Sequence, residues 1–487
     1  MSKNVAQGTY QTLIAKHRWP LLCGVLIFLF VLGLSLSTLT TKPRLWTDEA
    51  ASIELSKNFA TDGVLDFQFA PGKYTGFPYL LQSTGYPTTV PLAVLFTVFG
   101  FSFTLARVYM LVWMFLALAT VYMVVRKFFD AHVAVLSVLL LATFASYYAS
   151  GRTVVGEIPG FLFLLLALYW WLEKKSYVVT GFFMGLALVA KPSVFLLVLP
   201  AVFFVLTREP RRLIPRLFQV AVGMTPAGLA AVALATDQPF SLDFWRQVAV
   251  FYRNPYSSDI FANISHNLAG FLNSTTLIYF SVLFLVVLVA RFLVKRKETK
   301  WLYDFVGIYS LISFSYYLRS PGWLRYILIA ELLILIVLPH AVFTLACYAQ
   351  KRVKFLRTFQ MATVTVYLIS ALAVLQVVQL FTAADIYTSN QAMMVAHYLD
   401  KIYSHARVAV IDNANVYALL TNPKREGVLA LTGIPVIGKN PLLNPVLPQV
   451  VVSFPEDRFR DEAKDVLAAR YRFVENYQGF DIFELKP

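Results

Sequence analysis

The sequence predicts an α-helical polytopic membrane protein of about eleven transmembrane helices, followed by a small carboxyl-terminal α/β domain. Of its 487 residues, 58% are hydrophobic and 14% are charged, whereas about a quarter of the residues in soluble domains are charged. Apolar runs long enough to cross about 30 Å of hydrocarbon recur along the first four-fifths of the chain. We therefore predict a membrane region over residues 1–384 and a soluble domain over residues 385–487.

Eleven apolar segments are predicted to span the membrane: 19–39, 101–125, 131–150, 154–172, 177–190, 193–207, 213–236, 271–294, 301–318, 323–349 and 360–384. The first is longer than a usual signal core, and no small-residue cleavage pattern follows it, so we do not expect its removal as a signal peptide. The two cysteines, Cys23 and Cys347, both fall in apolar runs, so no disulfide framework is indicated.

The basic residues indicate how the chain crosses the membrane. The net charge is +15, but the Lys and Arg residues cluster between spans rather than on one soluble face, which argues against nucleic acid as a partner. Under the positive-inside rule, clusters after every second span mark the cytoplasmic side. We expect an integral plasma (inner) membrane protein with a cytoplasmic amino terminus, and with the first long loop and the carboxyl-terminal domain outside. The clusters are Lys16/Arg18, Arg126/Lys127, Lys174/Lys175, Arg208/Arg211/Arg212/Arg216, Arg291/Lys295/Arg296/Lys297 and Lys351/Arg352/Lys354/Arg357.

Two external segments, 40–89 and 237–273, are longer than a simple connection requires. In the first, residues 50–60 are predicted to form a helix lying on the membrane surface. Residues 90–99 are too few to span and are predicted to form a second interfacial helix. In the second segment, the aromatic and apolar positions of residues 244–253 predict a helix in the headgroup region.

The carboxyl-terminal domain is predicted from alternating short helices and strands. We expect helices at 390–403, 416–420 and 456–470, strands at 408–411, 428–431 and 449–453, and a hairpin of 471–476 with 480–485 that turns at Gln478-Gly479. Because no glycine loop of the nucleotide-binding kind is present, we assign the domain no chemistry. Its role is either acceptor recognition or bracing of the external face.

The chain is organised around Trp46-Thr47-Asp48-Glu49-Ala50-Ala51, which follows the first apolar run. A carboxylate beside hydrocarbon must find partners or change its pKa, so an ionisable residue there is a functional-site hypothesis. A simpler interpretation is that Asp48 only caps a helix beginning at Glu49, since Asp is a favoured N-cap residue.

Eight external cations near span ends are not required by the positive-inside rule. Together with Asp48 and Glu49 they could line a cavity that holds a phosphate, because Arg and Lys bind phosphoryl oxygens strongly. Taken singly, Lys191 could simply complement a helix end, and Arg107 could snorkel. Arg152 and Glu157 could form a plain ion pair. The eight cations are Arg44, Lys73, Arg107, Arg152, Lys191, Arg253, Arg319 and Arg325.

Transfer of a sugar from a lipid phosphate fits a carboxylate, a group of cations and a membrane edge. The acceptor hydroxyl needs a general base, and the departing phosphate carries charge that Arg and Lys stabilise. A divalent metal is possible because carboxylates are hard ligands, but these loops have no Asp-x-Asp pair and no His cluster, so no cofactor is expected.

The order and spacing of several motifs resemble those of membrane glycosyltransferases of the GT-C superfamily. The similarity is to glycosyltransferase family 39, which includes protein O-mannosyltransferases, and to the related lipid A aminoarabinose transferases. The motifs are Asp48-Glu49-Ala50, Thr84-Gly85-Tyr86-Pro87, Pro91 through Gly100 to Arg107, Arg152 to Pro159, Ala190-Lys191-Pro192, and Arg325-Tyr326.

The resemblance implies an inverting transferase that moves a sugar from a polyprenyl-phosphate donor to an acceptor hydroxyl. Asp48 would be the base, and Glu49 would hold the acceptor or a neighbouring cation. Tyr86-Pro87 stands where many relatives have His-Pro, which leaves the acceptor class, a glycan, a lipid or a protein, open. Candidate phosphate-binding residues are Lys73, Arg152, Lys191, Arg253, Arg319 and Arg325. Candidate acceptor or cavity residues are Tyr86, Arg107, Glu157 and Tyr326.

Two other functions remain open at this stage. A transporter or flippase of lipid-linked sugars would bind the same donor without chemistry, and it would show broken helices meeting at mid-membrane. A diphosphate-donor oligosaccharyltransferase would favour a metal. The identity of the sugar is not determined by these patterns.

Overall fold

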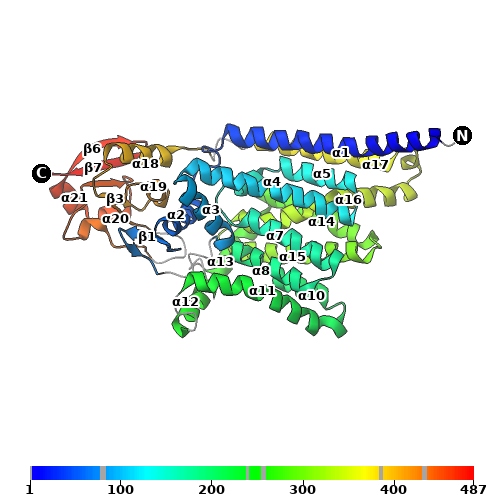
Figure 1. The fold of residues 1–487 in the computed structure, drawn as a ribbon, viewed down its shortest axis with the longest axis horizontal. Coiled ribbons are helices and arrows are strands. Elements are labelled where there is room, and N and C mark those ends of the chain that lie inside the picture. The colour runs from blue at the N-terminus through cyan, green and yellow to red at the C-terminus, as the bar shows by residue number, and fades with distance from the viewer. Residues whose placement is uncertain (1–2, 77–83, 237–240, 254–258, 383–387, 430–435) are drawn as a thin grey trace.

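The structure, a computed structural model, describes residues 3–76, 84–236, 241–253, 259–382, 388–429 and 436–487. A bundle of helices makes up most of the molecule, and a smaller sheet domain lies at one end of it (Figure 1). The predicted fold class, a polytopic helical membrane protein with a small carboxyl-terminal α/β domain, is confirmed.

Each of the eleven predicted spans corresponds to a helix or to a pair of consecutive helices. Six helices in the described part of the chain are long and apolar enough to cross a membrane, and α5 with α6, bent by 70°, makes a seventh. The predicted number of about eleven is reached only when shorter or less apolar helices are included. The bounds are α1 (Lys3–Ser37), α4 (Phe103–Phe128), α5 (Ala131–Thr143), α6 (Ala145–Gly151), α7 (Glu157–Tyr169), α8 (Tyr177–Ala190), α9 (Pro192–Phe195), α10 (Val198–Leu206), α11 (Leu213–Ala235), α14 (Thr275–Leu293), α15 (Lys297–Arg319), α16 (Leu328–Arg352) and α17 (Met361–Thr382).

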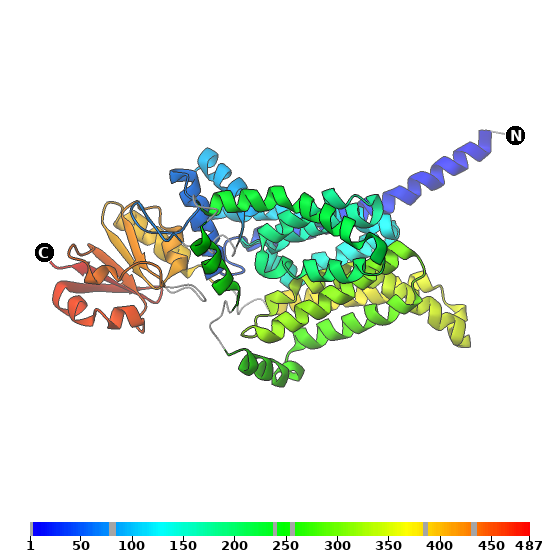
Figure 2. The ribbon, with the colours of Figure 1, turned by 90° about the horizontal axis from the view of Figure 1, so that it is seen from below.

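Helix α16 is the most enclosed of the long apolar helices. Of an 18-residue apolar stretch of α16, 72% is buried, against 11% of such a stretch in α1 and 28% in α17. Helices α1 and α17 run along one side of the bundle (Figure 1), and the amino-terminal part of α1 extends beyond it (Figure 2). The exposed apolar side chains of these outer helices suit contact with lipid.

The first long loop contains α2 (Thr47–Asp62), the short antiparallel strands β1 (Gln68–Ala70) and β2 (Lys73–Tyr74), and α3 (Tyr86–Phe99). The prediction of a surface helix at 50–60 is wrong in one respect, because every residue from Glu49 to Asn58 is buried. The cause is packing on two sides, since α2 lies against α3 and against the carboxyl-terminal domain. The second long loop contains α12 (Leu242–Arg253) and α13 (Ile260–Ala269).

The carboxyl-terminal domain has a five-stranded sheet in the order β4-β3-β5-β7-β6. Strand β3 is parallel to both β4 and β5, and β7 is antiparallel to β5 and β6. The strands are β3 (Val408–Ile411), β4 (Arg425–Val428), β5 (Val450–Ser453), β6 (Tyr471–Tyr477) and β7 (Phe480–Leu485). The helices are α18 (Gln391–Ile402), α19 (Ala414–Leu419), α20 (Arg458–Asp461) and α21 (Lys464–Arg470).

Most predicted elements of this domain lie at or near the expected residues. The hairpin turns at Gln478 and Gly479, which both have positive φ, 55° and 86°, as a tight hairpin turn requires. Strand β4 begins and ends three residues earlier than predicted, and positions 430 and 431 of the prediction lie outside the described residues. The helix predicted at 456–470 is two helices, α20 and α21.

Single-turn helices connect several of the longer ones. They are η2 (Trp170–Lys174), η3 (Pro210–Arg212), η4 (Phe271–Asn273), η5 (Leu324–Tyr326), η6 (Lys354–Thr358) and η8 (Pro441–Leu443).

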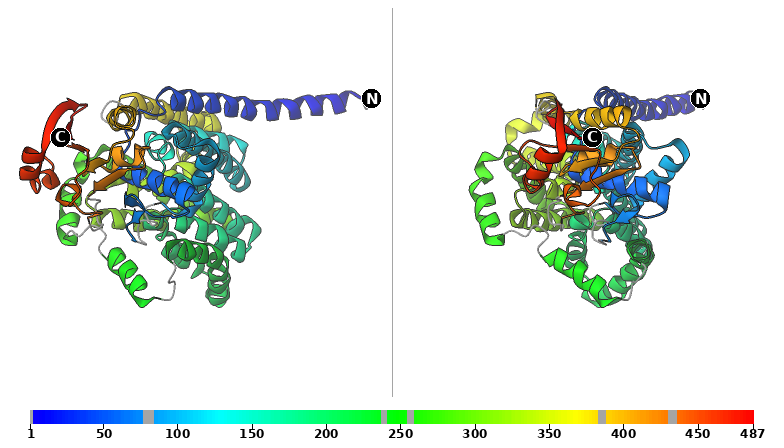
Figure 3. Two further views of the ribbon diagram at one scale, coloured as in Figure 1. Left: turned by 60° about the vertical axis from the view of Figure 1, so that its left-hand side comes forward. Right: turned by 90° about the vertical axis from the view of Figure 1, so that its left-hand side faces the viewer.

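The first long loop and the carboxyl-terminal domain share one hydrophobic core. This core contains Ile53 of α2, Phe67 of the first loop, and Val410 and Tyr417 of the domain. The domain, orange to red, lies against the blue first loop in both views of Figure 3. Two segments more than three hundred residues apart therefore pack as one unit.

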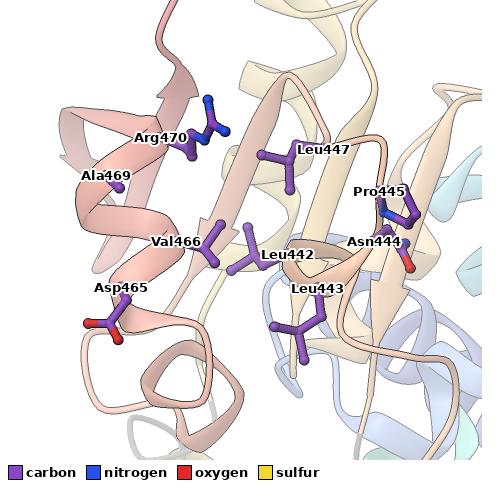
Figure 4. Close-up of a pocket in the computed structure, with 9 residues that line it drawn as sticks. All are labelled: Leu442, Leu443, Asn444, Pro445, Leu447, Asp465, Val466, Ala469 and Arg470. Carbon is purple, nitrogen blue, oxygen red and sulfur yellow. The ribbon is translucent and has the colours of Figure 1, made fainter.

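A surface hollow of about 510 Å³ lies on the far part of this domain, between η8 and α21 (Figure 4). Six of its nine lining residues are apolar, and the other three are Asn444, Asp465 and Arg470. None of the predicted site residues lines it.

Candidate active site

Asp48 lies in the first turn of α2, but it does not cap the helix. The N-cap residue is Trp46, in an extended conformation, and no side chain caps the helix there. The helix begins at Thr47, two residues before the predicted start at Glu49. The interpretation of Asp48 as a mere cap is therefore wrong, and its carboxylate is directed to other partners.

Two cations hold the carboxylate of Asp48. Arg325 Nη1 donates to Asp48 Oδ2 at 2.5 Å, and Lys191 Nζ lies 3.7 Å from the same oxygen. Burial raises the pKa of Asp48, but the charges of Arg325 and Lys191 outweigh burial and lower that pKa below its ordinary value. With 26% of its side chain exposed, Asp48 is an ionised carboxylate that a substrate can still approach.

Arg325 is held by a cage of aromatic rings. Its guanidinium lies 5.1 Å from the ring of Trp46, 4.6 Å from Trp323 and 5.5 Å from Tyr326. Burial alone would lower the pKa of Arg325. The nearby negative charge of Asp48 raises this pKa by more than burial lowers it, so the guanidinium stays charged. Contact with three rings restrains the guanidinium, and its Nε has no hydrogen-bond partner among the described residues.

Lys191 connects Asp48 to a second acid. Its Nζ lies 3.9 Å from Glu157 Oε1, and Glu157 is buried at the start of α7. Within the described residues, Glu157 Oε2 has no hydrogen-bond partner. A buried acceptor without a partner is costly, so this oxygen is available to a substrate group. We name Asp48, Glu157, Lys191 and Arg325 the site cluster.

Two glycines of the predicted motifs explain the position of Lys191. A Cβ on Gly156 would lie 1.8 Å from the carbonyl oxygen of Ala190, and a Cβ on Gly85 would lie 1.9 Å from that of Val189. The amide of Gly85 also donates to Ala190 O at 3.1 Å. The carboxyl end of α8 is therefore held between two backbones that approach more closely than any side chain allows.

Glu49 points away from the site cluster. Arg107 donates to it twice, from Nε to Oε1 at 2.6 Å and from Nη2 to Oε2 at 2.7 Å, and both side chains are fully buried. The amide of Val154 donates to Glu49 Oε1 at 3.2 Å. Burial raises the pKa of Glu49, and Arg107 only partly opposes this effect. The pair ties α2 to α4 and to the segment before α7.

Arg152 lies next to this pair rather than to Glu157. Its Nη1 donates to Thr38 Oγ1 at 2.7 Å, and its guanidinium lies 5.7 Å from the ring of Tyr148. No Arg152–Glu157 ion pair occurs among the described side chains. Arg152 Nε is buried without a hydrogen-bond partner in the described structure, which leaves one donor for an anion.

The other predicted site residues are distributed more widely. Tyr326 contributes to the cage of Arg325, and Tyr86 is half-buried at the start of α3. Arg319 lies at the end of α15, 6.0 Å from the ring of Tyr316. Lys73 is exposed on β2 and acts electrostatically on Glu426 of β4. The backbone of Arg253 ends α12, and its side chain lies outside the described residues.

Sequence reasoning missed Trp46, Trp323 and Thr38 as neighbours of the site. Trp46 and Trp323 each lie two residues before a predicted site residue, Asp48 and Arg325. An aromatic residue so close to a charged one at a membrane edge is a signal that could have indicated the cage. Thr38, at the end of α1, has no comparable signal. Among the described residues, no group of three or more His, Cys, Asp and Glu side chains is placed to hold a metal.

Comparisons with known proteins bear on the family resemblance and on the fold. A family model described as dolichyl-phosphate-mannose-protein mannosyltransferase matches residues 91–235. No curated protein matches the sequence. The structure of ArnT from Cupriavidus metallidurans bound to undecaprenyl phosphate is similar, with a TM-score of 0.63, 13% identity, and coverage of 96% of this chain and 97% of that chain. The archaeal oligosaccharyltransferase AglB from Archaeoglobus fulgidus, in complex with an inhibitory peptide and a dolichol-phosphate, has a TM-score of 0.55 at 12% identity, and the match covers 90% of this chain and 70% of that one.

The fold is that of an integral membrane protein. The resemblance to GT-C glycosyltransferases, and among them to the protein O-mannosyltransferase and ArnT-like group, which the motifs predict, is confirmed by the family model over residues 91–235 and by the structural matches.

Proposed function

We propose that this protein transfers a sugar from a polyprenyl-phosphate donor to an acceptor hydroxyl at the outer face of the membrane. One observation carries the proposal: a partly exposed carboxylate, Asp48, is held ionised between Arg325 and Lys191. A base that must act beside a departing phosphate needs this combination of an acceptor for the proton and cations for the leaving group.

The donor class is supported by the neighbours of this fold. ArnT was determined with undecaprenyl phosphate and AglB with a dolichol-phosphate, and both ligands are polyprenyl phosphates. In this chain Arg325 and Lys191 of the site cluster offer donors for such a phosphate. The apolar helices beside them supply the hydrocarbon environment that the lipid tail needs.

The reaction runs as a single displacement. The acceptor oxygen attacks the anomeric carbon of the sugar, a new carbon–oxygen bond forms, and the bond to the phosphate oxygen breaks with its electron pair. The hydroxyl proton passes to Asp48, and the lipid phosphate departs as an anion held by Arg325 and Lys191. The anomeric configuration inverts because one displacement occurs.

The low pKa of Asp48 fits a late proton transfer. In the free protein, Arg325 and Lys191 stabilise the ionised carboxylate. A phosphate that takes up part of their charge weakens this effect, so the pKa of Asp48 rises when the donor is in place. Donor binding therefore makes Asp48 a better base. Glu157 Oε2, the buried acceptor, is positioned to receive a hydrogen bond from a polar group of the substrate.

The arrangement of positive clusters supports an orientation in which the site cluster and the carboxyl-terminal domain face the outside of the plasma membrane. The acceptor then arrives from the extracytoplasmic side, and the donor arrives from the outer leaflet.

The test is sugar transfer by the purified protein from polyprenyl-phosphate sugars, in nanodiscs, with Asp48→Asn beside wild type. We expect the substitution to lower the rate by about 10²- to 10⁴-fold, the usual contribution of a general base. Asp62→Asn is a matched control, because Asp62 lies in the last turn of the same helix and bonds only to Tyr74 among described contacts. An unchanged rate in Asp48→Asn would exclude the base role. Loss of wild-type activity with a chelator and a requirement for diphosphate donors would support the oligosaccharyltransferase alternative.

A further inference from the structure

A second group of charges lies where α2 meets the carboxyl-terminal domain, with Glu54 and Lys57 about two turns of the helix beyond Asp48 and Arg425 on β4. Glu54 Oε1 accepts from Arg425 Nη2 at 2.6 Å, and Glu54 Oε2 lies 2.9 Å from Lys57 Nζ. All three residues are buried, with exposed fractions of 0% for Glu54, 6% for Lys57 and 5% for Arg425. We name Glu54, Lys57 and Arg425 the clamp.

Lys57 and Arg425 of the clamp donate hydrogen bonds to the carboxyl end of α19. Lys57 Nζ donates to Ala418 O at 2.7 Å and to Leu420 O at 3.0 Å. Arg425 Nη1 donates to Leu420 O as well, at 3.0 Å. These carbonyls have no partner within their own helix, and the negative end of the helix dipole favours cations there. The arrangement therefore fits one orientation of α2 against α19.

Stability alone does not account for three buried charges. Desolvation offsets much of the attraction within a buried ion pair, and well-packed apolar residues are often as stabilising. Apolar packing is already present beside the clamp, where the rings of Phe67 and Tyr417 stack with centroids 5.7 Å apart. What the ionic contacts add is direction, since hydrogen bonds fix the angle and the register of two surfaces.

Helix α2 joins the clamp to the site cluster without a break. Asp48 and Glu54 are six residues apart in one continuous helix, a distance of about 9 Å at 1.5 Å per residue. A tilt or rotation of α2 at the clamp therefore moves Asp48 relative to Arg325 and Lys191, which are placed by other helices. A displacement of about 1 Å at a reacting group can lower a rate 100-fold.

We propose that Arg425, together with Lys57, is a positioning residue for the transfer reaction: the carboxyl-terminal domain sets the orientation of α2, and thereby of Asp48, through Glu54. The proposal rests on the proposed function for its kinetic readout. It assigns a role to a domain that holds no residue of the site cluster.

The test compares full-length Arg425→Met with Arg460→Met. Arg460 also forms an arginine ion pair, with Asp481 at 2.6 Å, but this pair is partly exposed and lies within the carboxyl-terminal domain. Two quantities are measured in nanodiscs: kcat and donor KM for sugar transfer, and hydrogen–deuterium exchange of residues 48–56. For Arg425→Met we expect kcat to fall about 10- to 100-fold, donor KM to stay within about threefold, and exchange to become faster. Arg460→Met should change neither, and Arg425→Lys should recover part of kcat.

A triple variant, Glu54→Leu with Lys57→Met and Arg425→Met, separates positioning from stability. No charge is left unpaired, but the carbonyls of Ala418 and Leu420 lose their donors. We therefore expect the triple variant to fold with a lowered melting temperature, yet to keep the low kcat. A triple variant with wild-type kcat would overturn the proposal, as would wild-type exchange over residues 48–56 in Arg425→Met. If wild type transfers no sugar, the proposed function fails, and the exchange measurement alone decides whether the clamp positions α2.

Discussion

Helix α2 contributes residues to two groups of charges, the site cluster and the clamp, which differ in the burial of their side chains and in the lengths of their contacts. In the site cluster, Lys191 lies 3.7 and 3.9 Å from two carboxylates, Asp48 is partly exposed, and Glu157 Oε2 has no partner among the described residues. In the clamp, the contacts of Lys57 and Arg425 measure 2.6 to 3.0 Å, and all three residues are buried. The site cluster has one short contact, from Arg325 to Asp48 at 2.5 Å, but the longer contacts of Lys191 and the unpartnered oxygen of Glu157 leave capacity for a ligand. In the clamp every contact is short and buried, and these contacts hold two parts of the fold together.

Glu49 resembles the clamp in having short, buried contacts, although it is the neighbour of Asp48 in sequence. Its two oxygens accept two bonds from Arg107 and one from the amide of Val154. Adjacent carboxylates thus have different surroundings, because successive residues of a helix point in directions about 100° apart. We infer that Asp48 acts on substrate and that Glu49 acts on the fold.

The largest expected effect comes from breaking the Glu49–Arg107 pair. Arg107→Met leaves a buried carboxylate without its cation, so we expect a loss of about 3–5 kcal/mol in unfolding free energy, the usual cost of such a break. The measurement is thermal or denaturant unfolding in detergent. The double variant Glu49→Leu with Arg107→Met should recover most of the loss. A Glu49→Gln protein of normal stability without transfer activity would instead assign Glu49 a direct role, as the family resemblance implies.

The next effect concerns the backbone that positions Lys191. In Gly156→Ala the added methyl would lie 1.8 Å from Ala190 O, so the end of α8 must move and carry Lys191 with it. We expect the transfer rate to fall about 100-fold, because displacements of about 1 Å at a site have that effect. Gly228→Ala, where nothing lies within 4 Å of the added atom, is the control. Equal rates in the two variants would show that Lys191 needs no exact placement.

A smaller effect is expected in the pH dependence of the rate. Burial raises the pKa of Asp48 and the charges of Arg325 and Lys191 lower it by more, so the net shift is downward from 3.8. The base therefore stays ionised above that pH, and its ion pairs add stability that is lost only as the pH falls through the lowered pKa. In Arg325→Gln the lowering is reduced, so the acid limb of kcat/KM should move to higher pH. An acid limb at the same pH in both proteins would show that Asp48 is not the titrating group.

Patterns in the sequence were sufficient for the fold class, and they singled out four charged residues that the structure brings together. The spans follow from apolar length, and the hairpin at Gln478-Gly479 follows from turn chemistry. Asp48, Lys191, Glu157 and Arg325 were all candidates because each is a charge at a membrane edge. Local patterns carry this information because the cost of a charge near hydrocarbon depends little on the rest of the fold.

Partners that lie far away in the chain could not be predicted in the same way. The burial of α2 depends on α19, and the clamp joins Glu54 to Arg425 across 371 positions. An Arg152–Glu157 ion pair was the simpler alternative for two charges five residues apart, but Arg152 bonds to Thr38 and Glu157 faces Lys191. Which charge meets which is decided by helix packing, and single-sequence periodicity does not contain it.

The smallest expected effect concerns a charged residue that lies outside the site cluster. Lys73 is one of the predicted phosphate-binding residues, but it is exposed on β2 and acts on Glu426 of the carboxyl-terminal domain. An exposed charge of this kind contributes about 0–1 kcal/mol to stability, so Lys73→Ala should leave both unfolding and sugar transfer within about twofold of wild type. Lys191→Met, measured beside it, should slow transfer strongly, because Lys191 lies between the two carboxylates of the site cluster. If Lys73→Ala instead raises donor KM by tenfold or more, the phosphate site extends over the first loop. Lys73 would then belong with the residues that bind substrate rather than with those that only stabilise the fold.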